Sequence, residues 1–313
     1  MDPFFVGRWH ANSVIEWVNW LKYDCAMSFQ WLNWSNPVSF WWIFLICVSI
    51  LNISFWSWTY FYRFRSVPIN FIFRRPLSPK TTIWFSAFYV FGCAFRSALP
   101  RADVQRMAIF DTWFSSIFIG RTVASIAELS FVVQWSITIA FLAHTTGSSI
   151  AAKISRLIVL LIFIAEVFSW YAVIRTHYIG NAVEESLWAL TYCLIGLAIW
   201  NLKDHLKGML RTAATITVMG CTVYVAFMIL IDVPMYIHRL QQDTLSGKPL
   251  LSLWAGFVDL NTHWTVTHNI QEWREEIPWM SLYFSLAVWV SLALCYLPLD
   301  REKIKAFVID KIN

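Results

Sequence analysis

Residues 110–144 read FDTWFSSIFIGRTVASIAELSFVVQWSITIAFLAH and are long and apolar enough to cross a bilayer. Since a spanning helix needs about 20 mainly apolar residues, we expect one at 117–144. The same stretch contains Asp111, Arg121 and Glu128. At about 1.5 Å per residue, Arg121 falls near one membrane interface and Glu128 about 10 Å deeper. A charge that faces lipid costs at least about 2.5–3.5 kcal/mol near the bilayer centre, so Glu128 is expected to face the protein interior.

The composition of the whole chain indicates the same class of protein. Of its 313 residues, 58% are hydrophobic and 14% are charged, and the mean hydropathy is +0.55. This is more apolar surface than one soluble core could hide. The 20 Trp and 11 Tyr residues fit a membrane protein, because amphipathic rings settle where hydrocarbon meets headgroups. We therefore expect a multi-pass integral membrane protein whose partner is the lipid bilayer rather than nucleic acid, in a membrane that the sequence does not identify.

Further segments satisfy the same length criterion, so we predict an all-α bundle of seven transmembrane helices. The expected spans are 38–62, 81–98, 117–144, 154–175, 178–200, 211–237 and 277–298. The bundle is assigned to 38–300 and ends in a short basic tail at 301–313. Residues 1–37 are too polar to span and predict an amphipathic helix in the outer interface. The connection 239–276 mixes aromatic and charged residues and is expected to form an ordered outer cap.

The distribution of basic residues predicts the orientation of the bundle. If the loop 63–80 is cytoplasmic, that side collects 14 of the 24 Lys and Arg residues but only four of the 19 Asp and Glu residues. Basic loops are retained in the cytoplasm, so the N-terminus is expected outside and the C-terminus inside. Such basic loops are also suited to contact anionic lipid.

Ionisable residues gather in the outer half of the predicted helices. Arg121 and Glu128 share one helix face, and Asp232, Tyr236 and Arg239 form another stripe with helical spacing. Charges in a membrane turn inward and pair or meet water, so these residues predict a polar cavity open to the non-cytoplasmic side. The ligand-binding candidates are Arg101, Arg106, Arg121, Glu128, Glu166, Glu184, Asp232, Tyr236 and Arg239. A buried ion-pair network that only fastens the helices together is the structural alternative.

The expected function is the binding of a small anionic, zwitterionic or amphipathic ligand in this charged cavity. The nearly uncharged inner half of the spans argues against a continuous transport path. A second hypothesis is a structural subunit whose aromatic surfaces contact partner membrane proteins, since rings of this kind anchor interfaces as well as lipid.

A third hypothesis is an enzyme that acts on a lipid or lipid-linked substrate at the outer leaflet. Imidazole and carboxylate groups together bind zinc and similar divalent ions. The candidates for metal ligands are His238, His263, His268 and Asp232, and those for acid–base catalysis are Glu184, Glu185 and Asp232. The predicted helix 277–298 contains no lysine, so a retinal Schiff base is not expected. Whether the protein is an enzyme stays open from the sequence.

Overall fold

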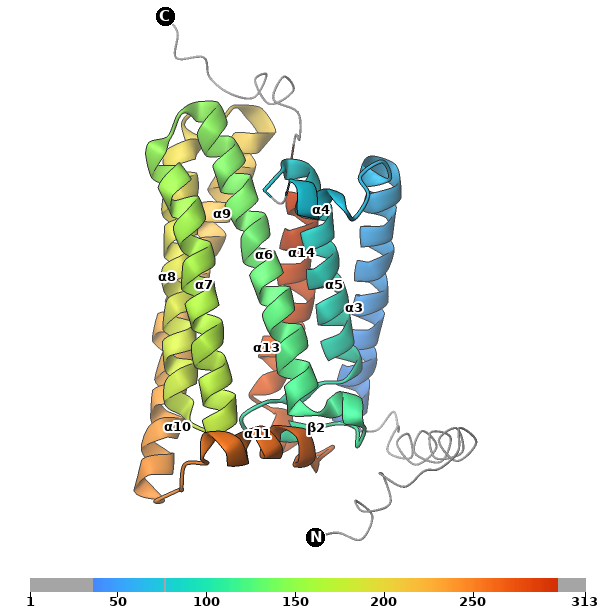
Figure 1. The fold of residues 1–313 in the computed structure, drawn as a ribbon, viewed down its shortest axis with the longest axis vertical. Helices are drawn as coiled ribbons and strands as arrows, with labels where there is room; N and C mark the ends of the chain where they lie inside the picture. The colour runs from blue at the N-terminus through green and yellow to red at the C-terminus, as the bar shows by residue number, and fades with distance from the viewer. Residues whose placement is uncertain (1–35, 76, 298–313) are drawn as a thin grey trace, which may run out of the picture.

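The computed structural model describes residues 36–75 and 77–297 and has a bundle of long helices as its body (Figure 1). Six helical runs are long and apolar enough to cross a membrane: Pro37–Phe64, Ile117–Thr146, Ser149–Arg175, Tyr178–Lys203, Gly208–Leu245 and Glu276–Leu294. They confirm the prediction of an all-α, multi-pass integral membrane protein. The remaining predicted span, 81–98, corresponds to α5 (Thr82–Ala98). Its 17 residues stand at the lower limit of about 17–25 residues for a spanning helix.

The elements follow one another as helices with three short strands, where η denotes a 3₁₀ or π turn. In chain order they are α3 (Pro37–Thr59), η2 (Tyr60–Phe64), α4 (Phe71–Arg74), η3 (Pro79–Thr81), α5, β1 (Arg101–Ala102), β2 (Met107–Ala108), η4 (Trp113–Ser115), α6 (Ile117–Thr146), α7 (Ser149–Arg175), α8 (Tyr178–Lys203), α9 (Gly208–Phe227), η5 (Met228–Asp232), α10 (Val233–Leu245), α11 (Leu253–Thr262), β3 (Thr265–Val266), α12 (Ile270–Trp273), α13 (Glu276–Leu282), η6 (Tyr283–Ala287) and α14 (Val288–Leu294).

Short turns with defined capping residues join α6, α7 and α8. Gly147 ends α6 in the left-handed region with φ at 76°. Ser148 then caps α7, because its Oγ accepts a hydrogen bond from the backbone N–H of Ala151 at 3.2 Å. Thr176, with φ at 51°, ends α7 just before α8 begins at Tyr178. Turns this short hold consecutive helices antiparallel, so α6, α7 and α8 pack as neighbours.

The fifth long run extends beyond its predicted bounds of 211–237. It reaches from Gly208 to Leu245 because the helix continues past Pro234. Proline lacks an N–H, and its ring clashes with the carbonyl group four residues earlier. The wide turns of η5 directly before α10 accommodate this clash. The helix α10 therefore includes the first residues of the connection 239–276 that the sequence assigned to the cap.

The rest of that connection forms a folded layer across one end of the bundle, the cap layer, made of α11, β3 and α12 (Figure 1). Strand β3 pairs in parallel with β2, which pairs antiparallel with β1. Trp273 of α12 is fully buried, its Nε1 donates to the Thr267 carbonyl at 2.9 Å, and its ring lies 5.6 Å from that of Trp41. At Gly256 a Cβ would lie 1.9 Å from the Ile174 carbonyl oxygen, so glycine permits the close contact of α11 with α7.

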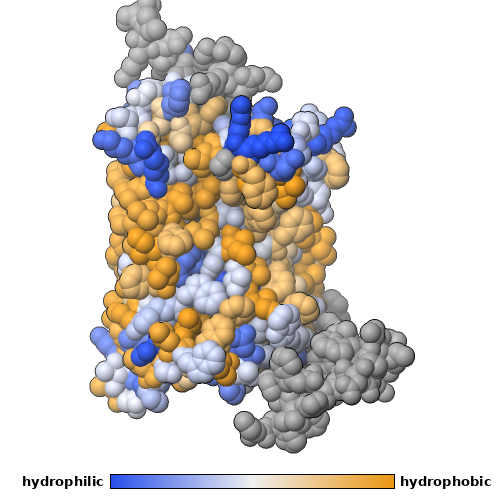
Figure 2. Space-filling model, viewed as in Figure 1, coloured by the Kyte–Doolittle hydropathy of each residue, from blue (hydrophilic) through white to orange (hydrophobic). Residues whose placement is uncertain are grey.

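The molecular surface has an apolar belt between two more hydrophilic ends (Figure 2). The loops that join α3 to α5, α6 to α7 and α8 to α9 all lie at the end opposite the cap layer (Figure 1). These loops and the helix ends beside them contain most of the clustered arginine and lysine residues in the described part of the chain, such as Arg74, Arg75 and Lys207, and we call this the basic end. Large apolar side chains such as Trp200, Val223 and Leu230 are exposed on the long helices, as lipid-facing residues are.

Two sequence predictions lie outside the described residues. The interfacial helix expected in 1–37 falls almost wholly in 1–35, and the basic tail 301–313 follows the last described residue, Leu297.

Candidate functional site

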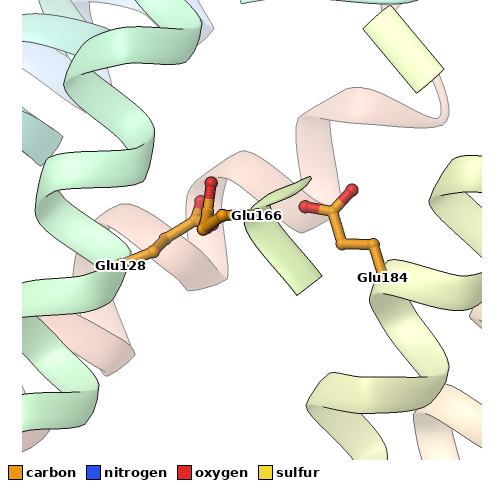
Figure 3. A group of neighbouring side chains, drawn as sticks. All are labelled: Glu128, Glu166 and Glu184. Atoms are coloured by element: carbon orange, nitrogen blue, oxygen red, sulfur yellow. The ribbon is translucent and has the colours of Figure 1, made fainter. Parts of the chain in front are cut away.

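A buried arginine surrounded by carboxylates lies in the half of the bundle nearer the cap layer. Arg121 of α6 forms ion pairs with Glu128 and Glu166 at 3.0 Å each, with Glu184 at 3.7 Å, and with Asp103 at 3.9 Å. Figure 3 shows the side chains of the three glutamates converging from α6, α7 and α8. We call these five residues the Arg121 cluster.

Neutral hydrogen-bond donors hold the carboxylates of this cluster in place. The hydroxyl of Ser125, one turn from Arg121, donates to Glu166 Oε2 at 2.6 Å. Trp170 Nε1 in turn donates to Ser125 Oγ at 3.1 Å, and the Tyr283 hydroxyl donates to Glu128 Oε1 at 3.1 Å. These contacts confirm that Arg121, Ser125 and Glu128 share one face of α6. The cluster therefore joins four helical elements through charged and neutral bonds.

The charges of the Arg121 cluster do not balance among themselves. With every group ionised, one arginine and four carboxylates give a net charge of −3. A buried charge without a partner is costly, so the cluster needs protons or further positive charge nearby. Arg96 and Arg101, which line the adjoining cavity, supply part of it.

The cavity has a volume of about 130 Å³, well above the roughly 10–15 Å³ that a single water molecule needs. Its walls include three arginines, Arg96, Arg101 and Arg121. Five carboxylate residues also line it, namely Asp103, Glu128, Glu184, Glu185 and Glu276. Most of the remaining wall is aromatic, with rings such as Trp188, Tyr192, Tyr224, Tyr236 and Trp279. Such a lining suits a ligand that has both charged and apolar parts.

Arg101 is held in the wall by the backbone rather than by a carboxylate. Its Nη1 donates to the Phe114 and Ser116 carbonyl oxygens at 3.1 and 3.0 Å, and the residue is 1% exposed. Burial lowers the pKa of the Arg101 guanidinium to about 10. A Cβ at Gly120 would lie 1.8 Å from Arg101 Nε, so the glycine leaves the space that this guanidinium occupies.

The structure brings together only part of the predicted ligand-binding set. Arg101, Arg121, Glu128, Glu184 and Tyr236 line the cavity, and Glu166 stands behind it against Arg121. Asp232 is buried in η5, apart from the lining residues.

The predicted ligand arginines Arg106 and Arg239 are bound elsewhere. Arg106 pairs with Asp259 of the cap layer at 2.8 Å and donates to the Val173 carbonyl at 2.7 Å. Arg239 pairs with Glu275 and lies over the Tyr236 ring, 5.7 Å from its centroid. Arg106 therefore fastens the cap layer to α7, and Arg239 joins α10 to the segment before α13, but neither arginine lines the cavity.

The predicted histidine ligands have separate partners. His238 contacts Gln242 at 3.0 Å, and His263 contacts Asp259 at 3.1 Å. His268 bonds to the Ile109 carbonyl at 2.9 Å, and burial lowers the pKa of its imidazole. Within residues 36–75 and 77–297, these histidines and Asp232 do not gather into a group of three metal-ligating side chains.

Glu128, Glu166 and Glu184 do form such a group, with one oxygen atom of each within 4.8 Å of the others. Arg121 Nη2 lies within hydrogen-bond or ion-pair distance of all three. The guanidinium thus takes the place between the three carboxylates where a metal ion would bind.

Many cavity residues stand outside the predicted ligand-binding set, among them Arg96, Asp103, Glu276 and Tyr283. Asp103 and Glu276 belong to segments that the sequence places in or beside loops, and they reach the cavity only because the cap layer folds over the bundle. Tyr283 is uncharged, so nothing in the sequence distinguishes it as a site residue within its apolar helix. Arg96 ends an apolar helix and is the one member with a signal in the sequence.

A second buried polar cluster lies nearer the basic end and contains no charge. Gln134 Nε2 donates to the Thr82 carbonyl at 3.0 Å, and the Ser291 hydroxyl donates to Gln134 Oε1 at 2.6 Å. Ser86 Oγ lies 3.1 Å from Ser291 Oγ. These four residues, the Gln134 cluster, join α14 to α5 and α6 through hydrogen bonds.

Comparisons with known proteins assign no relative to the chain. No protein-family model matches it, and searches of curated proteins and of solved structures find no match either. The function must therefore be proposed from the site itself.

Proposed function

We propose that the protein crosses the membrane seven times and binds a small zwitterionic or amphipathic ligand in the cavity beside the Arg121 cluster. The seventh span in this proposal is α5, which packs between α3 and α6 inside the bundle. The basic end is cytoplasmic, in keeping with the retention of arginine and lysine loops on that side. The cavity then lies in the non-cytoplasmic half.

One observation supports ligand binding most directly: eight charged residues surround a single cavity, and they do not all pair with one another. A network that served only to fasten helices would be expected to satisfy its buried charges. Carboxylates outnumber arginines in the wall by five to three, and Arg121 already pairs with three of these five, namely Asp103, Glu128 and Glu184. A purely anionic ligand therefore fits less well than a zwitterionic or amphipathic one.

Calorimetry with a short amphipathic probe tests this proposal. We would place the protein in phosphatidylglycerol nanodiscs and titrate hexyl phosphoethanolamine, with hexanol as the uncharged control. The variant Ala287→Trp fills the cavity from η6 and is expected to abolish saturable probe binding without changing hexanol partitioning. If Ala287→Trp melts normally and still binds hexyl phosphoethanolamine as tightly as wild type, the proposal is contradicted.

Cysteine labelling tests the orientation. A membrane-impermeant thiol reagent applied from outside is expected to label Ser246→Cys, between α10 and α11, but not Lys207→Cys, between α8 and α9. The unaltered chain gives the background from its own cysteines. The reverse labelling pattern would place the cavity in the cytoplasmic half.

A second candidate function is acid–base catalysis on a lipid or lipid-linked substrate. It is favoured by two adjacent cavity carboxylates in unlike settings, since Glu184 contacts Arg121 and Asn181 whereas Glu185 has no such bond. Unlike environments are how enzymes divide acid and base roles between carboxyl groups. Hydrolysis of dihexanoyl phosphatidylethanolamine, followed by phosphorus NMR, is expected for wild type and not for Glu184→Gln or Glu185→Gln. Absence of turnover in wild type would exclude this candidate.

A further inference from the structure

Two oppositely charged residues in the cavity wall lack partners. Glu185 of α8 is 8% exposed and forms no hydrogen bond or ion pair with any residue in the described part of the chain. Arg96 of α5 likewise forms no ion pair there, and its Nε is buried without a hydrogen-bond acceptor. Its guanidinium instead lies over the Phe284 ring, 5.8 Å from the centroid. Glu185 is buried and Arg96 is half-buried, and although Arg96 adds positive charge near the Arg121 cluster, neither residue has a direct counter-ion in this part of the chain. Opposite charges bound in the cavity would stabilise both.

A buried hydrogen-bond acceptor accompanies Glu185. Asn181 lies one helical turn before Glu185 on α8 and also lines the cavity. Its Nδ2 donates to Glu184 Oε2 at 3.3 Å, which fixes the amide so that Oδ1 is the free atom, and this Oδ1 is buried without a donor. Two neighbouring acceptors without donors are suited to a cation that has N–H groups.

The surroundings of Glu185 favour an organic ammonium group over a metal ion. Trp188 and Tyr192 follow on the same face of α8, and the rings of Tyr224 and Tyr236 line the same cavity. Aromatic rings attract ammonium groups through their π faces. A hard metal ion instead needs about six oxygen ligands, and Glu185 is outside the group of convergent carboxylates.

The two charges come from different helices that line one cavity, Arg96 from α5 and Glu185 from α8. Figure 1 places α5 and α8 on either side of α6 and α13, and both charges are near the helix ends that adjoin the cap layer. The Arg121 cluster also adjoins the cavity, but its four carboxylates outnumber its single arginine, so it cannot neutralise Glu185. A molecule that satisfied both must therefore carry its own opposite charges at two ends.

We infer that the ligand of this cavity is a zwitterion whose protonated amine binds Glu185 and Asn181 and whose phosphate or carboxylate binds Arg96. This inference rests on the proposed function. It adds that the ligand carries both charges, and it states which end of the ligand binds which side chains. A lipid headgroup and a free water-soluble zwitterion share this chemistry. Arg96 suits either anion, because guanidinium binds phosphate and carboxylate in a planar, two-pronged geometry.

Calorimetry in phosphatidylglycerol nanodiscs tests the assignment, because that lipid has no amine to compete. The probes are hexyl phosphoethanolamine, hexylamine, hexyl phosphate and hexyl phosphocholine. Glu185→Gln is expected to weaken the binding of hexyl phosphoethanolamine and hexylamine, the two probes with N–H groups, at least 10-fold. It should leave the binding of hexyl phosphate unchanged. Arg96→Gln is expected to weaken the binding of hexyl phosphate and hexyl phosphoethanolamine. It should leave the binding of hexylamine unchanged. Hexyl phosphocholine, which has no N–H, is expected to bind wild type at least 10-fold more weakly than hexyl phosphoethanolamine.

Matched controls are Glu272→Gln and Arg274→Gln, which remove the same charges from exposed positions of the cap region and should change no affinity. Unaltered amine binding in Glu185→Gln, or unaltered phosphate binding in Arg96→Gln, would overturn the zwitterion assignment while the proposed function stood. Failure of wild type to bind any probe would overturn both. Phosphoethanolamine without a chain separates the sources: affinity equal to that of the hexyl probe indicates a soluble ligand, and at least 10-fold weaker binding indicates a lipid.

Discussion

The Arg121 cluster and the Gln134 cluster are two ways in which this bundle buries polar groups. The Gln134 cluster is neutral, and its side chains bond to one another and to backbone carbonyl groups. The Arg121 cluster is charged, and it adjoins a cavity where Arg96 and Glu185 form no ion pair with any residue of 36–75 or 77–297. A neutral, bonded cluster is sufficient to fix helix positions. The charged cluster therefore has a requirement that packing alone does not explain, and the proposed ligand would meet it.

The largest effect is expected for Arg121→Leu. The change leaves Glu128, Glu166 and Glu184 buried without their shared cation, and breaking a buried pair in this way costs about 3–5 kcal/mol. Denaturant unfolding of the purified protein measures the free energy of unfolding. Glu185→Gln is the matched control, since it removes a charge that has no pair to break, and it should not destabilise the protein. An unchanged unfolding midpoint in Arg121→Leu would mean that water reaches the three carboxylates.

A smaller loss is expected for Gln134→Leu in the neutral cluster. The substitution removes the acceptor for the Ser291 hydroxyl and a donor to the Thr82 carbonyl, and a buried group left unbonded costs about 1–3 kcal/mol. The same unfolding measurement checks it. Probe affinity in the cavity should stay unchanged, because Gln134 is not part of the wall. A large change in affinity would show that the two clusters are coupled.

Gly120→Ala tests how much the packing of Arg101 in the cavity wall contributes to stability. The added methyl group would overlap Arg101 Nε and Nη2, so the guanidinium must shift away from the Phe114 and Ser116 carbonyl groups. Overpacking of this kind costs about 1–3 kcal/mol. Gly220→Ala is the control, because a Cβ there meets no atom within 4 Å. Equal stability of the two variants would show that the Arg101 guanidinium can shift without a loss of stability.

The smallest effect on stability is expected from His268, which lies between β3 and α12. Its pKa in the folded protein lies below the ordinary value of 6.5, so near and below that pH the unfolded chain binds more protons than the folded one. Stability should therefore fall as the pH decreases from about 6.5 through the lowered pKa. Melting curves between pH 7 and 5 should show a shallower pH dependence in His268→Gln than in wild type. His263→Gln, at an exposed imidazole, should match wild type.

The sequence by itself determined the class of the protein and part of the site. Hydropathy gave the long apolar helices, because a bilayer requires continuous apolar segments whatever their neighbours are. Helical spacing placed Arg121, Ser125 and Glu128 on one face, since contacts within one helix follow from its pitch alone. The count of seven spans and the orientation stay predictions.

Only the tertiary structure decided which charges meet. Arg106 and Arg239 resemble Arg121 in the sequence, yet Asp259 and Glu275 from the folded cap region bind them, whereas four carboxylates from a loop and three helices surround Arg121. Which carboxylate reaches which arginine depends on helix packing and on how the cap layer folds, and neither is encoded in local spacing. The same packing left Arg96 and Glu185 unpartnered, which is the feature that points to a ligand.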